Sequence, residues 1–158
     1  MKKIAANYLV SETGKFLKNG IMLAEDDGTV VEIIDTAGDL DEIAQLTFLN
    51  GILLSGSVFT RINAESQISE SAHSFSSIIN QSVEELSQIS IYQLIELGKQ
   101  VQEQFPELKI QEIINEITAF LLDGSRFRKE NIPGIFLLIG TDLLGLHFTP
   151  KSRLRKIL

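Results

Sequence analysis

Few side chains in this protein have the chemistry of a catalytic or metal-binding group. The 158 residues include two histidines and no cysteine, so thiolate nucleophiles, thiolate metal ligands and disulfides are excluded. His73 lies in the run Ser-Ala-His-Ser, but Ser–His catalysis needs a serine on a sharp turn, and no Gly-x-Ser-x-Gly motif is present. His147 alternates with Leu146 and Phe148, which predicts a place on the wetter face of a strand. Neither histidine is predicted to be catalytic.

The acidic groups do not have the spacing of a cation site. Glu25, Asp26 and Asp27 are consecutive, whereas an EF-hand spreads its ligands over about twelve residues. A solvated turn is the better explanation. The formal net charge is −7, with 14 basic against 21 acidic side chains, and binding to a phosphate backbone needs a basic face. The sequence therefore predicts no metal, no cofactor and no nucleic-acid partner.

The apolar segments are too short for a membrane. The most apolar stretch runs from Ile135 to Leu146 and contains Asp142, whereas a spanning helix needs about 20 apolar residues. The first residues are interrupted by polar side chains and do not resemble a signal peptide. Together with the absence of cysteine, these features predict a cytoplasmic protein with no membrane partner.

Both ends of the chain have the pattern of strands. In the first β-rich region, 2–62, two β-branched runs flank the Asp-Gly pair at Asp27 and Gly28, which predicts a hairpin. In the second, 131–158, the continuous apolar run Ile135–Ile139 after Pro133-Gly134 is typical of a buried strand. The segment 144–148 is predicted to be its antiparallel partner.

The middle of the chain, 66–123, has the pattern of helices. Ser90 and Gln93 have the spacing of a capping box, and the helix that they begin should end before Pro106. Apolar residues then recur at helical spacing from Ile110, and Gly124 is the predicted stop. Shorter and less regular helices are expected between 66 and 90.

These regions predict one α+β domain over 1–158. Strands at both chain ends, 2–62 and 131–158, should form one small β-sandwich with the helical segment 66–123 inserted between them. A complete (β/α)₈ barrel needs at least about 200 residues, so no TIM barrel is expected.

The two β-rich ends are similar to the terminal parts of a known superfamily. The segments Lys3–Leu9, Asp26–Ile33 and Phe48–Val58, followed at the far end by Ile132–Leu138 and Leu146–Leu154, resemble the amidohydrolase superfamily of metal-dependent deaminases and hydrolases. The resemblance implies the composite β-sandwich that flanks the barrel in that superfamily. It also implies that most of the barrel is missing.

The differences from the superfamily fall on its metal site. Arg61 and Asn63 stand where the resemblance places two metal-binding histidines, and Glu65 aligns with a nearby glutamate of the family. A guanidinium has no lone pair for a metal, and an asparagine carbonyl is a poor ligand for zinc. The later ligands of the family belong to the missing strands. The resemblance therefore implies no metal and no enzymatic activity.

Two kinds of function follow from this interpretation. The first is a non-catalytic amidohydrolase-like protein that acts as a binding or protein-interaction module. Loss of the barrel would expose apolar surface, which helices, a homodimer or another protein chain would cover. The alternative is a small-molecule-binding protein or enzyme with a new site near Arg61, Asn63 and Glu65, since arginine pairs with carboxylates. Complementation by a separate barrel-bearing chain is a third hypothesis.

Overall fold

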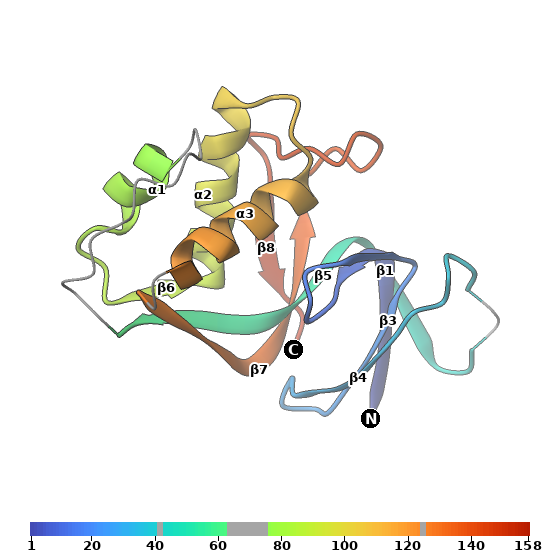
Figure 1. Cartoon of the computed structure of the whole chain (residues 1–158). Helices are drawn as coiled ribbons and strands as arrows, with labels where there is room; N and C mark the ends of the chain where they lie inside the picture. Colours follow the sequence, from blue (N-terminus) through green and yellow to red (C-terminus); the bar gives the residue numbers. More distant parts are fainter. Residues whose placement is uncertain (41–42, 63–75, 124–125) are drawn as a thin grey trace.

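Strands from both ends of the chain join in one mixed sheet, and helices cover one of its faces (Figure 1). The computed structural model describes residues 1–40, 43–62, 76–123 and 126–158. The strands in these ranges are β1 (Lys2–Val10), β2 (Phe16–Lys18), β3 (Ile21–Ala24), β4 (Val30–Ile34), β5 (Leu46–Arg61), β6 (Gln88–Ser90), β7 (Phe127–Ile139) and β8 (Arg153–Lys156). The helices are α1 (Ser76–Val83), α2 (Ile91–Gln104) and α3 (Ile110–Leu122).

The order of the strands is β4-β3-β1-β5-β7-β8, with β2 beside β1 and β6 beside β5. β1 and β5 run parallel, and the other described pairs run antiparallel. The predicted mixture of strands and helices is confirmed. The arrangement as a two-layer sandwich, and its likeness to the amidohydrolase composite domain, stay predictions. None of the described helices is long and apolar enough to cross a membrane.

The centre of the sheet is buried on both faces. Successive residues of a strand point to opposite faces, so on β5 Ile52 and Leu54 pack toward the helices while Leu53 packs into a second apolar cluster. On β7 the same alternation places Phe136 and Leu138 under the helices. This double burial explains the continuous apolar run that the sequence shows.

The two longer helices begin where the sequence predicts. The Ser90 hydroxyl accepts a hydrogen bond from the backbone N–H of Gln93 at 3.3 Å, and the Gln93 side chain accepts one from the Ser90 backbone at 2.7 Å, which confirms the capping box. α2 ends before Pro106, and α3 starts at Ile110. Both helices turn their apolar stripes to the sheet. Gly124, the predicted helix stop, lies outside the described residues.

Two local predictions in the last region are wrong. β7 starts at Phe127 rather than after Gly134, and Pro133 lies within it. Pro133 is tolerated because the register between β5 and β7 shifts here, and a bulge does not need its missing N–H. The segment 144–148 forms turns and a single bridge instead of a strand, because the Asp142 carboxylate accepts hydrogen bonds from the next backbone N–H groups.

The bulge of β7 also receives the hairpin turn between β3 and β4. The backbone N–H of Gly134 donates to the carbonyl of Gly28 at 2.9 Å. Gly28 has a φ of +87°, and a Cβ on it would lie 2.8 Å from both N and Cα of Gly134. At this point the hairpin therefore contacts β7 through backbone atoms.

Replacing Gly28 by alanine is expected to destabilise the fold because it adds both backbone strain and a collision with rigid backbone. Strain at a positive φ costs about 1–3 kcal/mol, and the collision should add to it. Gly38→Ala is the matched control, since its φ is +88° but the nearest atom to a new Cβ is 4.0 Å away. Urea unfolding of the two variants measures the difference. Equal losses of unfolding free energy would show that the Gly28–Gly134 contact contributes nothing.

Candidate functional site

Arg61, the last residue of β5, has a guanidinium that holds the end of α1. Its Nε donates to the carbonyl of Leu86 at 2.8 Å, and its Nη2 donates to the carbonyls of Val83 and, at 3.3 Å, Glu84. Val83 is the last residue of α1, and the final carbonyls of a helix lack partners within it. Arg61 donates to the last carbonyl of α1 and to two carbonyls of the segment that follows it. It also places positive charge where the helix dipole favours it.

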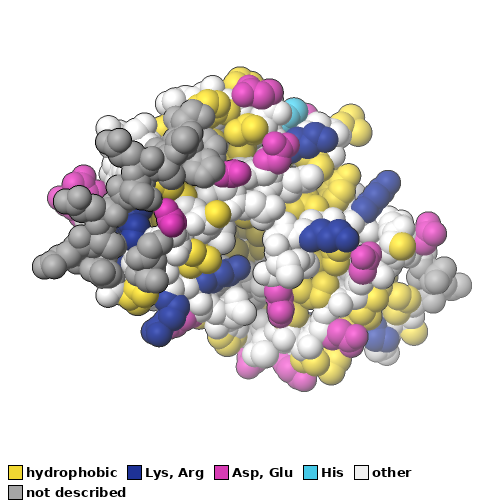
Figure 2. Space-filling view, viewed as in Figure 1, with side chains coloured by type: hydrophobic (Ala, Val, Ile, Leu, Met, Phe, Trp, Pro, Cys, Tyr) yellow, Lys and Arg dark blue, Asp and Glu magenta, His cyan; other side chains and the backbone are white. Residues whose placement is uncertain are grey.

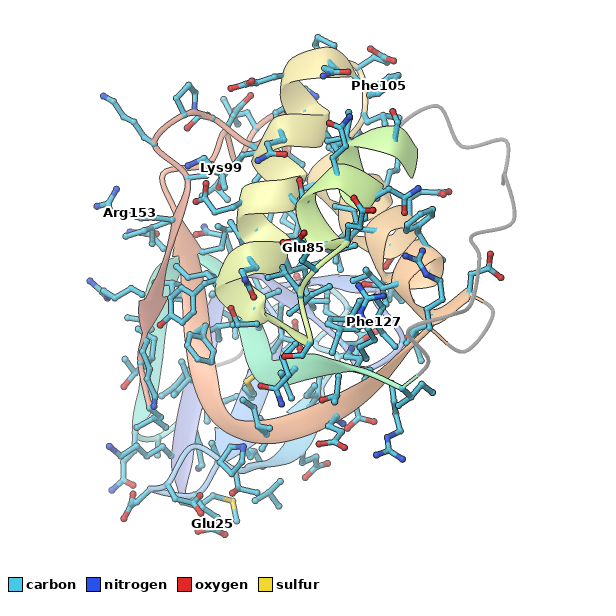
Figure 3. All side chains as sticks on the ribbon, turned by 90° about the vertical axis from the view of Figure 1, so that its left-hand side faces the viewer. Glu25, Glu85, Lys99, Phe105, Phe127 and Arg153 are labelled. Carbon is cyan, nitrogen blue, oxygen red and sulfur yellow. The ribbon has the colours of Figure 1, made fainter. Side chains whose placement is uncertain are left out.

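Phe127 on the neighbouring strand faces the same guanidinium. Arg61 and Phe127 are opposite each other in the register of β5 and β7, and the Arg61 Cζ lies 4.7 Å from the centre of the ring. Phe127 is buried, and Figure 3 shows it between the sheet and the helices. A guanidinium over an aromatic face is an attractive contact. Arg61 thus connects β5, β7 and α1.

The hydrogen bonds of Arg61 bear on the alternative hypothesis of a ligand site. The donors described above point to backbone carbonyls of this chain rather than to open space. Asn63 and Glu65, the other two residues of the predicted site, lie outside the described residues, as does His73. The grouping of Arg61, Asn63 and Glu65 around a ligand stays a prediction.

Arg126 is a buried arginine, whereas Arg61 is only partly buried, and no sequence pattern indicates this burial. Arg126 is 4% exposed, and its guanidinium lies 5.2 Å from the ring centre of Phe120 and 6.0 Å from that of Phe127. Its Nε and Nη1 have no hydrogen-bond partner within the part of the chain that the structure describes. Nothing in the sequence distinguishes Arg126 from Arg128, which is exposed.

Burial and charge both act against the protonated form of Arg126. Loss of hydration is the main cause that lowers its pKa, and the nearby positive charge of Arg61 lowers it further, while Asp123 acts in the opposite direction. Two guanidinium groups near one aromatic cluster therefore repel each other in a poorly hydrated place. This arrangement binds no metal, since arginine offers no lone pair.

His147 lies in the turn after β7 and not on a strand. Its Nδ1 is 3.7 Å from Oδ2 of Asp142, and the two residues form the bridge that replaces the predicted strand. Hydrogen bonds from the backbone of Gly145 and Leu144 lower the pKa of the Asp142 carboxyl, and His147 acts in the same direction. Among the described residues no three histidine or carboxylate side chains gather as metal ligands would.

A recess of about 420 Å³ opens between the helices and the sheet, apart from the Arg61 cluster (Figure 2). Its walls are the turn between β1 and β2, the middle of β5 and β7, and the facing sides of α2 and α3. The buried part of its lining is mainly apolar and includes Leu54, Phe59, Leu94 and Ile114. No sequence pattern indicates this recess, because its walls come from five separate segments.

Comparison of the chain with protein-family models, with curated proteins and with solved structures found no match. The amidohydrolase resemblance therefore rests on the sequence segments alone.

Removing the Arg61 guanidinium is expected to destabilise the protein. Arg61→Met removes the hydrogen bonds to the carbonyls of Val83, Glu84 and Leu86. Hydrogen bonds to charged groups contribute about 1.5–3 kcal/mol each, so a loss of about 2 kcal/mol or more is expected. Arg128→Met is the control on the neighbouring strand, since Arg128 makes one ion pair with Glu130 in which both side chains are exposed, worth about 0–1 kcal/mol. Urea unfolding compares them. Similar, small losses would contradict the anchoring role.

Removing the Arg126 guanidinium is expected to change the free energy of unfolding in the opposite direction. A buried guanidinium that lacks hydrogen bonds at two of its nitrogen atoms in the described structure is costly, and an apolar side chain of similar length avoids that cost. Arg126→Met is therefore expected to leave the free energy of unfolding unchanged or to raise it by about 1 kcal/mol or more. The same urea experiment measures this. A marked loss of stability would show that the chain supplies a compensating anion.

Proposed function

We propose that this protein is a non-catalytic relative of the amidohydrolases that acts as a binding module. Arg61 carries the proposal. At the position where the resemblance places the first metal-binding histidine, the side chain donates inward to the end of α1 and stacks on Phe127. A residue committed to these contacts joins the helical segment to the sheet and has no free electron pair for a metal.

The fold supports the proposal in a second way. The helices bury one face of β5 and β7, which is apolar surface that would need another cover in their absence. The recess between helices and sheet is a place where such a module would bind a ligand. It offers a better location than the surroundings of Arg61, whose described donors are already used.

The proposal includes a protein partner, either a second copy of this chain or another chain. Its support is the exposure of large apolar side chains on three strands, namely Val31, Phe48 and Ile132. Contact with a partner would remove this surface from water. A cytoplasmic location is part of the same proposal and rests on the absence of cysteine.

The metal content of the purified native protein tests the proposal. Mass spectrometry under non-denaturing conditions is expected to find no stoichiometric transition metal, and the same spectrum gives the number of chains in the assembly. Asn63→His restores one of the two histidines without disturbing Arg61, and it should also bind no metal. One tightly held zinc or iron ion per chain in the native protein would overturn the non-catalytic interpretation.

A further inference from the structure

We propose that the recess binds a small carboxylic acid with an apolar body, and that Ser57, Lys129 and Asn131 hold its carboxylate. This inference rests on the binding part of the proposed function, and it names the chemical class of the ligand. It does not depend on the amidohydrolase resemblance.

The size and depth of the recess suit a small organic molecule. A volume of about 420 Å³ falls within the range of about 300–1,000 Å³ that is usual for ligand pockets. Phe59 lies at its sheet side, and Leu94 and Ile114 lie at its helix side; all three are buried. An aromatic or aliphatic body would replace water against these side chains, which is favourable.

Ser57 places a hydroxyl without a partner among these apolar side chains. The residue lines the recess and is only 6% exposed, and its hydroxyl makes no hydrogen bond within the described ranges. The Ser57 Oγ atom is not one of the described atoms that are buried without a partner, so it reaches the open space of the recess. Water or a ligand in the recess can form a hydrogen bond with it.

Two further donors lie on the same face of the sheet as Ser57. Asn131 is directly opposite Ser57 in the register of β5 and β7, and Lys129 is opposite Phe59, two residues along. Residues opposite each other in an antiparallel pair share a face, and the diagonal neighbour is within reach of a long side chain. All three line the recess. Neighbouring residues in the lining of the recess thus carry a hydroxyl, an amide and an ammonium group, and the amide and the ammonium belong to exposed residues.

The charge of the recess selects a carboxylate. Lys129 is the one cationic residue in its lining, and Glu12, on the turn between β1 and β2, is the one anionic residue. Burial lowers the pKa of Lys129, and the charge of Glu12 opposes this effect. The Lys129 side chain is exposed, and it makes no ion pair within 4 Å in the described structure. A singly charged carboxylate matches one ammonium, whereas a phosphate would face Glu12 with excess charge.

Glu12 leaves two sources for the same carboxylate. A simple carboxylic acid uses the sheet donors alone, and an amino acid with an apolar side chain would also place its ammonium group near Glu12. Both sources carry the carboxylate, and only the amino acid adds an ammonium group. Probes with and without that ammonium group therefore distinguish them.

The test compares 3-phenylpropanoate with its neutral amide, 3-phenylpropanamide, at matched ionic strength. Isothermal titration calorimetry on the full chain is expected to show about tenfold tighter binding of the acid, because a hydrogen bond to a charged group is worth about 1.5–3 kcal/mol. Lys129→Met should remove this preference. Lys151→Met, which changes an exposed lysine outside the recess, should keep it. Ser57→Ala should weaken binding of the acid by about threefold or more.

Phenylalanine is the third probe. Tighter binding of phenylalanine than of 3-phenylpropanoate, lost in Glu12→Gln, assigns an amino acid; weaker binding assigns a simple acid. Equal affinity of acid and amide, a preference that survives Lys129→Met, or no binding of any probe would overturn the inference. Those results would leave the non-catalytic interpretation standing, because the metal content tests it separately.

Discussion

The antiparallel pairing of β5 with β7 is the interaction on which the other parts of the structure depend. It joins the first β-rich region to the last, although the helical segment lies between them in the sequence. Both faces of this pair carry apolar side chains, so both must be covered. The helices cover one face, and the second apolar cluster, which includes side chains of β1 and β3, covers the other. A bulge in the same pair receives the turn at Gly28 and so fixes the hairpin against β7.

The two arginines beside Phe127 show how little residue type alone says about a role. Arg61 and Arg126 lie near the same ring of Phe127. Arg61 faces the end of α1, where its guanidinium donates hydrogen bonds to backbone carbonyls. Arg126 has two nitrogen atoms without partners in the described structure. The contacts of Arg61 therefore join sheet and helices, whereas those two nitrogen atoms of Arg126 are a buried polar group for which the described structure supplies no acceptor.

Arg61 and the proposed ligand pocket lie at different points along the same pair of strands. Going along β5 toward its end, the face under the helices presents Ser57, then Phe59 and finally Arg61. Ser57 and Phe59 line the recess, and Arg61 meets α1. One strand can thus support the helical segment at its end and a recess at its middle. The superfamily resemblance directs attention to Arg61, but the open space lies four residues earlier.

The sequence by itself determined the features that arise from local physical chemistry. The capping pair Ser90 and Gln93, the break before Pro106 and the stripe that begins at Ile110 each act within a few residues, and all three are confirmed. Long-range packing instead places Pro133 inside a strand and makes 144–148 a turn. The contacts of Arg61 and the recess at Ser57 also belong to this second group. Each depends on groups brought together from distant segments, and such proximity leaves no periodic pattern in the chain.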